Sequence, residues 1–189
     1  MSTIIAVKKN GRACLAADTL VTWGGTKQTG TYLADLSKIV KIGDTYLGIT
    51  GVSVHLQVIE NYFANCESYS FDTPQDIFET WRQFHKALKD EYFWAAGDEK
   101  ELPYEQSHMH VLLANPRGIF GVYSLRSVDA YNKFWAFGSG TEYALGALYG
   151  AYDRYENVED IARAGIEAAA EFDNGSALPM TIHTVELVK

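Results

Sequence analysis

The residue with the clearest chemical potential is a serine at the second position. Met1 precedes Ser2, and an initiator methionine in front of a small residue is expected to be removed. Removal would leave a serine whose own α-amino group adjoins its hydroxyl. An α-amine titrates near about 7.7–8.0, so much of it is neutral at working pH. A hydroxyl with its own base attached is an activated nucleophile, and Ser2 is therefore a candidate catalytic residue.

Further polar residues stand where predicted strands or helices begin or end. Each of these residues, taken alone, also has an ordinary structural explanation. Asp18 could be an acidic residue of a turn, Lys38 a solvent-exposed charge at a strand edge, and Ser139 the first residue of a helix. The chain has no G-x-S-x-G elbow and no Walker loop. The residues of this polar set are Asp18, Lys38, Ser139, Asp173 and Ser176.

The cysteines and histidines give no metal-binding pattern. Cys14 and Cys66 share no metal-ligand spacing, and two small buried thiols are expected. His108 and His110 would lie on one face of a strand, but no third ligand is evident. We therefore expect no metal site and no cofactor.

The composition narrows the class of protein. The 189 residues give room for one compact domain, or at most two small ones, and no linker or repeat divides them. Sixteen Lys and Arg against twenty-four Asp and Glu give a formal charge of −8, which argues against a general nucleic-acid binder and against an anionic membrane surface as partner. No apolar run approaches the roughly 18 residues of a membrane helix, and the N-terminus lacks the charge order of a signal peptide. We expect a cytoplasmic protein without nucleic-acid or membrane partners.

The first 51 residues carry four strand signals. Asn10-Gly11 predicts a hairpin between the first two strands, which puts the chain terminus at a sheet edge. The Gly- and Thr-rich stretch 21–35 predicts a loop or an irregular hairpin. The four predicted strands span residues 3–7, 12–18, 38–42 and 45–50.

Two helices follow, and then strands and helices recur. Thr73-Pro74 is typical of a helix start, with Thr as N-cap and Pro at the first helical position. This order of grouped strands and helices predicts an α+β fold in which two sheets are each covered by a helix pair. The predicted helices span 52–68, 74–96, 141–152 and 158–172, and the remaining strands 108–115, 118–124, 131–137 and 181–188.

These motifs, in their order, resemble a known family. The stretch from Ser2 to Gly11, followed by Ala16-Ala17-Asp18, is similar to the start of proteasome β-type subunits and closest to the bacterial HslV-type peptidase. Counted from Ser2, Asp18 falls at the family's interval, while Leu36-Ser37-Lys38-Ile39 comes a few residues later than in HslV-type chains. The other stretches that carry the resemblance are Gly48-Ile49-Thr50-Gly51, Phe137-Gly138-Ser139-Gly140 and Asp173-x-x-Ser176, the last of which differs in HslV-type chains.

The resemblance implies an N-terminal nucleophile hydrolase, with a four-layer αββα sandwich formed by residues 1–189 as a single domain. It also implies self-association into stacked hexameric or heptameric rings that enclose the active sites, with a peptide or an unfolded protein as substrate. HslV-type peptidases work with a ring ATPase unfoldase that opens the pore, and no docking motif here identifies such a partner.

The resemblance also implies roles for the polar residues. Ser2 Oγ would attack a peptide carbonyl with the Ser2 amine as general base, and Lys38, held by Asp18, would stabilise the alkoxide. The N–H of Gly48 would donate to the oxyanion. Ser139, Asp173 and Ser176 would orient the amine and a water.

The substrate would bind in an extended conformation. Its backbone would pair with Thr22, Gly48 and Thr50, and Tyr46 would line the specificity pocket. Two other functions stay open: a catalytically silent ring-forming protein of the same fold, and an amidase that acts on small amides. A silent protein would not need the polar set, and the match to ring-forming subunits disfavours the amidase.

Overall fold

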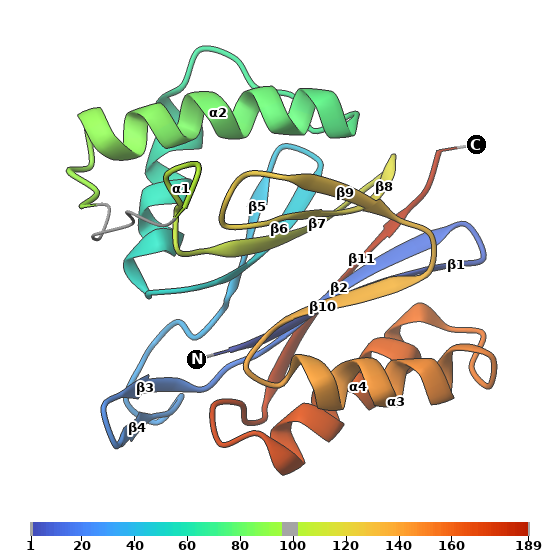
Figure 1. Cartoon of the computed structure of the whole chain (residues 1–189). Helices are drawn as coiled ribbons and strands as arrows, with labels where there is room; N and C mark the ends of the chain where they lie inside the picture. Colours follow the sequence, from blue (N-terminus) through green and yellow to red (C-terminus); the bar gives the residue numbers. More distant parts are fainter. Residues whose placement is uncertain (1, 96–101, 189) are drawn as a thin grey trace.

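Two β-sheets lie face to face in the computed structural model, and a pair of helices covers the outer face of each (Figure 1). The structure describes residues 2–95 and 102–188. These four layers confirm the αββα sandwich. Within the described residues, no helix is both long and apolar enough to cross a bilayer.

The first sheet holds the start and the end of the chain. β1 (Thr3–Lys9) and β2 (Arg12–Asp18) form the predicted hairpin, and both residues of its Asn10-Gly11 turn have positive φ. β10 (Phe134–Gly138) pairs with the free side of β1, and β11 (Met180–Glu186) with that of β2. The order is therefore β10-β1-β2-β11, and the expectation that the chain terminus lies at a sheet edge is wrong, because β10 returns from the second half of the chain.

The second sheet is antiparallel throughout, in the order β5-β6-β7-β8-β9. The predicted strand 131–137 proves to be two: β9 ends at Tyr131 in this sheet, and β10 begins at Phe134 in the other. A separate short hairpin, β3 (Val21–Trp23) and β4 (Thr26–Gln28), occupies part of the stretch expected to be irregular. The strands of the second sheet are β5 (Ile39–Ile42), β6 (Thr45–Thr50), β7 (His110–Asn115), β8 (Gly118–Val122) and β9 (Val128–Tyr131).

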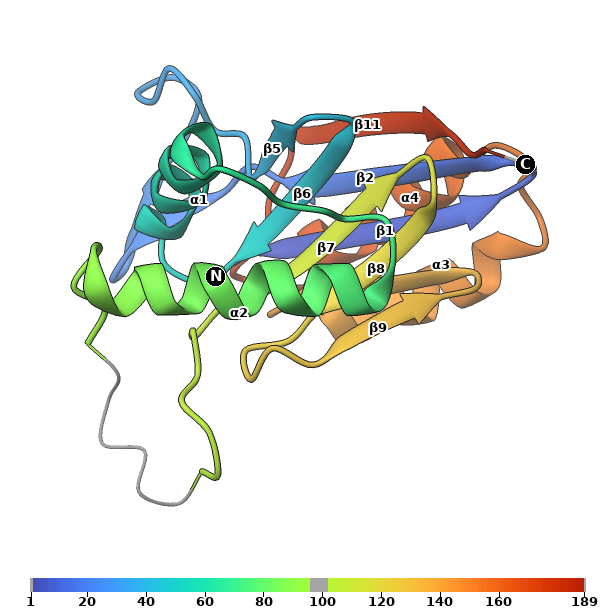
Figure 2. The same ribbon diagram turned by 90° about the horizontal axis from the view of Figure 1, so that it is seen from above.

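The helices cover the outer faces of the sheets. Figure 2 shows α1 and α2 above the second sheet, whose strands cross those of the first sheet at an angle. The helices are α1 (Val54–Asn65), α2 (Pro74–Asp90), α3 (Thr141–Tyr152) and α4 (Val158–Phe172).

α2 begins as expected but ends early. The Thr73 side chain accepts a hydrogen bond from the N–H of Asp76, as an N-cap does. The helix was expected to continue to about residue 96, which lies outside the described residues. It ends at Asp90 because Phe93 adopts a left-handed φ of 54° and the N–H of Trp94 turns back to the carbonyl of Leu88.

Apolar side chains fill three spaces between the four layers. β1 and β2 contribute to two of them: Ile4 and Leu15 face the second sheet, while Ile5 and Cys14 face α3 and α4. Because both faces of these strands are covered, their sequences are apolar almost without alternation. The third cluster, under α1 and α2, is rich in aromatic residues, including Phe63, Trp81 and Phe84. Cys66 is only half-buried, unlike Cys14, and both thiols are free.

Candidate active site

Ser2 immediately precedes β1, and only 7% of the residue is exposed. Its carbonyl oxygen accepts a hydrogen bond from the N–H of Ser139 at 2.9 Å. Gly138 lies against the same carbonyl with a φ of 116°, and a Cβ at this position would overlap the Ser2 oxygen. The end of β10 can therefore lie against the backbone of Ser2 only with a glycine at position 138.

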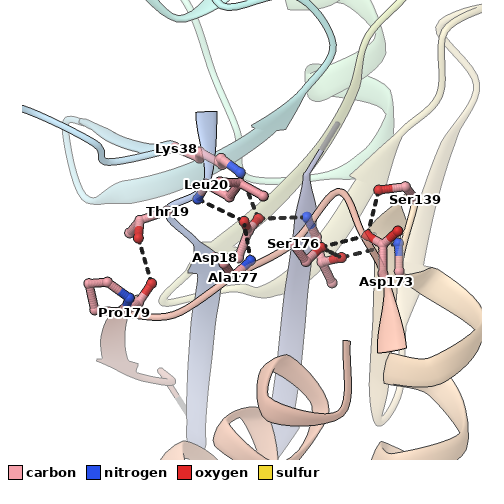
Figure 3. A network of polar contacts seen from close by, with 11 residues as sticks. Asp18, Thr19, Leu20, Lys38, Ser139, Asp173, Ser176, Ala177 and Pro179 are labelled. Carbon is pink, nitrogen blue, oxygen red and sulfur yellow. Dashed lines mark hydrogen bonds and ion pairs between the residues drawn. The ribbon is translucent and has the colours of Figure 1, made fainter. Parts of the chain in front are cut away.

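Asp18, at the end of β2, is a fully buried hydrogen-bond acceptor (Figure 3). Its Oδ1 accepts from the ammonium of Lys38 at 2.7 Å and from the N–H of Thr3 at 2.8 Å. Four donors fill the acceptor capacity of a carboxylate and compensate the buried charge. Since Thr3 follows Ser2, one carboxylate fixes both the serine backbone and the lysine side chain. The other two donors, to Oδ2, are the N–H groups of Leu20 at 2.9 Å and Ala177 at 3.2 Å.

Lys38 reaches Asp18 from the second sheet. It stands just before β5, and its carbonyl accepts a hydrogen bond from the N–H of Ile49 in β6 at 3.0 Å. The residue is only 9% exposed. Burial lowers the pKa of Lys38, while the charge and hydrogen bond of Asp18 oppose this shift. The ion pair joins the two sheets beside Ser2.

A second polar network lies on the other side of β1 (Figure 3). Asp173, directly after α4, accepts hydrogen bonds on Oδ2 from the hydroxyls of Ser139 and Ser176, both at 2.7 Å. Burial acts to raise the pKa of Asp173, but these two hydrogen bonds and one from the backbone of Gly175 hold it below its usual value. Asp173 is therefore a carboxylate, and both serine hydroxyls are oriented as donors toward it.

Thr3 connects the two networks, and sequence reasoning missed it. Its N–H donates to Asp18, while its Oγ1 lies 2.7 Å from the Oγ of Ser176 and accepts from the N–H of Gly140 at 3.2 Å. Because Ser176 donates to Asp173, Thr3 is the donor to Ser176. The one available signal was that Thr3 follows the candidate nucleophile.

A cavity of about 610 Å³ opens beside Ser2 and Lys38. Its walls come from α1, the end of β6, the start of β3 and the segment 33–38. Thr22, one of the residues expected to bind substrate, lines this cavity. Because Ser2 belongs to the same wall, a substrate bound in the cavity would lie against the serine.

Tyr46, Gly48 and Thr50 lie outside the cavity. The three residues share one face of β6, and this face packs onto the first sheet, whereas Ile49 on the opposite face lines the cavity. Tyr46 stacks on His183 with ring centroids 4.5 Å apart, so it is not positioned to form a specificity pocket. The hydroxyl of Thr50 donates to the carbonyl of His110 at 3.3 Å.

The glycine beside the cavity is Gly51. The expectation that the N–H of Gly48 donates to the oxyanion therefore needs correction. Gly48 lies between β5 and β7, so the sheet uses its backbone groups, and a Cβ there would lie 3.5 Å from the Cβ of Ile4. Gly51 follows the strand with a φ of 137° and lines the cavity, and a Cβ there would lie 2.6 Å from Nδ1 of His55. The sequence contains both glycines, but only the second follows the end of the strand.

The arrangement suits nucleophilic chemistry by a hydroxyl group. The structure brings Asp18, Lys38, Ser139, Asp173 and Ser176 together around the start of β1, next to a cavity that could hold a substrate. No three His, Cys, Asp or Glu side chains within residues 2–95 and 102–188 are grouped as a metal site requires.

An αββα sandwich whose first strand starts at a buried serine, with a lysine–aspartate pair beside it, defines the proteasome β-type class of N-terminal nucleophile hydrolases. The chain is 43% identical to Thiobacillus denitrificans BPH, a proteasome-like bacterial protein, with a TM-score of 0.92 and 98% of each chain covered. The chain therefore belongs to the proteasome β-type, HslV-like family.

Two further structures agree with this assignment. The structure of Thiobacillus denitrificans BPH in complex with epoxomicin matches with a TM-score of 0.93 and 42% identity, over 99% of this chain and 100% of that one. Eukaryotic HslV from Trypanosoma brucei shares the fold, with a TM-score of 0.65 and 20% identity over 97% and 99% of the two chains. No protein-family model and no curated protein matches the chain.

Proposed function

We propose that this protein is a subunit of a ring-shaped, self-compartmentalising peptidase that uses Ser2 as its nucleophile. Catalysis requires the removal of Met1, because only a free α-amine on Ser2 can act as a base. The observation that carries this function is the buried Asp18–Lys38 pair at 2.7 Å, which adjoins Ser2 at a cavity large enough for a substrate side chain.

In this mechanism the Ser2 hydroxyl adds to the carbonyl carbon of a peptide bond, and its proton passes to the Ser2 amine, directly or through a water. The Lys38 ammonium lowers the pKa of the hydroxyl and stabilises the alkoxide. The N–H of Gly51, at the cavity wall, donates to the oxyanion. The amine then protonates the leaving nitrogen, which gives an ester on Ser2 Oγ, and water hydrolyses this ester to release the acid and restore the hydroxyl.

Two residues outside the direct chemistry position this machinery. Asp18 keeps Lys38 charged and fixed, and it holds Ser2 through the N–H of Thr3. Ser139 holds the Ser2 carbonyl, and its hydroxyl is fixed in turn by Asp173. The structure of the 42% identical BPH in complex with epoxomicin supports the proposal that this chain also has an active site.

Self-association into stacked rings in the cytoplasm is part of the same proposal. The outer face of α3 supports it, because Tyr149 is 82% exposed there, and Tyr143 pairs with Phe172, which is 68% exposed. Exposed aromatic side chains on an outer helix pair are typical of a protein–protein contact.

Hydrolysis of fluorogenic peptides by the purified full chain tests the function. Ser2→Ala should lower kcat/KM by at least about a thousandfold. Ser68→Ala, which changes an exposed serine between α1 and α2 that does not line the cavity, should leave kcat/KM unchanged. Equal rates in wild type and Ser2→Ala would instead indicate a silent ring-forming protein. Turnover of small amides without turnover of peptides would favour the amidase.

A further inference from the structure

Among the described residues that line the cavity, two are carboxylates and one is a cation, which is already paired. Asp35 and Glu60 line the cavity, and Lys38, on the same wall, is bound to the buried Asp18. Asp35 accepts a hydrogen bond from the N–H of Ser37 at 2.8 Å, which leaves its charge uncompensated. Glu60 is exposed, and its side chain forms no hydrogen bond or ion pair with any residue in the described part of the chain. The cavity is therefore negatively charged apart from the catalytic pair.

α1 sets the order of side chains along the cavity. Ser53, Leu56, Gln57 and Glu60 all line it, and their spacing puts them on one face of the helix. Gly51, which lines the cavity together with Ser2, comes just before this face begins. Glu60 thus lies at the end of the wall away from the nucleophile, about 10 Å from Ser53 along the helix axis.

Apolar side chains form part of the middle of the cavity. On the helix wall between Ser53 and Glu60, Leu56 lies beside the polar Gln57, and Ile49 and Val21 contribute from the strands. A long side chain on a helix leans toward the helix N-terminus, which brings a carboxylate at position 60 back toward this middle section. An apolar passage that ends at a carboxylate fits a side chain with an aliphatic stem and a cationic head.

We propose that Glu60, assisted by Asp35, selects peptide substrates with Lys or Arg at the residue whose carbonyl Ser2 attacks. The selection rests on the proposed peptidase function and adds a substrate class to it. The aliphatic stem lies along Leu56, and the cationic head pairs with the carboxylate at the far end of the cavity. Acidic side chains at the same substrate position are repelled.

The test uses four fluorogenic peptides that differ only in the residue before the cleaved bond: Arg, Lys, Leu or Glu. The wild-type protein should cleave the Arg and Lys peptides with the highest kcat/KM. Glu60→Gln should lower the Arg-to-Leu ratio of kcat/KM about fivefold, the effect of one exposed ion pair. The ratio should also fall with added salt. Glu67→Gln removes another exposed carboxylate, outside the cavity, and should leave the ratio unchanged.

The outcomes separate the selectivity from the peptidase function. If the wild type cleaves the Leu peptide at least as well as the Arg peptide, and Glu60→Gln leaves the ratio unchanged, the selectivity is wrong while the peptidase function stands. If no peptide is cleaved faster by the wild type than by Ser2→Ala, the peptidase function fails and the selectivity fails with it. Glu60→Lys reverses the charge and should move the preference toward the Glu peptide.

Discussion

Acid should destabilise the fold through one buried histidine. His55, on α1, is 1% exposed, and neither of its ring nitrogens has a hydrogen-bond partner within the described residues. Burial, together with the nearby His108, lowers the pKa of His55 from 6.5 to about 4. The imidazole is therefore neutral in the folded chain over a pH range in which the same group in the unfolded chain is already protonated.

The size of the effect follows from this difference in pKa. Above pH 6.5, His55 is neutral in both the folded and the unfolded chain, so its contribution to the free energy of unfolding does not change with pH. Between pH 6.5 and about 4, only the unfolded chain binds the proton, and the free energy of unfolding falls as the pH falls. At about 1.4 kcal/mol per pH unit, the whole window amounts to about 3 kcal/mol. Below the pKa of the folded chain both states bind the proton, and no further loss occurs.

Urea unfolding of wild type and His55→Leu, at neutral pH and near the lower end of the window, measures this contribution. Protomer concentration must be the same in all samples, because assembly shifts the apparent stability. Carboxylates and the other histidines titrate in both proteins, so they cancel in the comparison. The wild type should lose about 3 kcal/mol more than His55→Leu on acidification. A difference below about 1 kcal/mol would refute a buried, neutral His55.

Two further substitutions follow from the site. Asp18→Asn leaves the Lys38 ammonium buried without its counter-charge. The free energy of unfolding measured in urea should fall by about 3–5 kcal/mol, and peptide hydrolysis should be lost. A variant that is fully active and equally stable would contradict the role of the ion pair. Gly138→Ala forces a methyl group against the Ser2 carbonyl and should lower the free energy of unfolding by more than about 2 kcal/mol. Its control, Gly146→Ala, adds a methyl group in open space on α3 and should raise the stability by up to about 1 kcal/mol; equal effects of the two would contradict the close approach at Gly138.

Most of the elements could be predicted because their signals are local. Strong turn and capping residues and regular apolar spacing place β2, β6, α3 and α4 with the bounds that the structure has. The pairing of β1 with β10 could not be predicted, because it joins distant parts of the chain. For the same reason, one apolar run at 131–137 did not show that the chain passes from one sheet to the other within it.

Part of the candidate site could also be predicted from local sequence signals, and part could not. Residues at the ends of elements, such as Asp18 and Ser139, could be named from motif order, and the structure gathers them around β1. Gly48 and Tyr46 were expected at the oxyanion and the specificity pocket, but they lie on the face of β6 that packs onto the first sheet. The sequence alone does not tell which face of a strand meets the other sheet. Thr3 was missed because its importance lies in tertiary contacts with Ser176 and Gly140, not in its residue type.

Mass analysis of the N-terminal peptide after incubation with epoxomicin bears most directly on Ser2 as the nucleophile. If Ser2 is a processed N-terminal nucleophile, the peptide begins at Ser2 and carries one inhibitor molecule. A peptide that still begins at Met1, or a peptide that begins at Ser2 and stays unmodified, would contradict catalysis by Ser2.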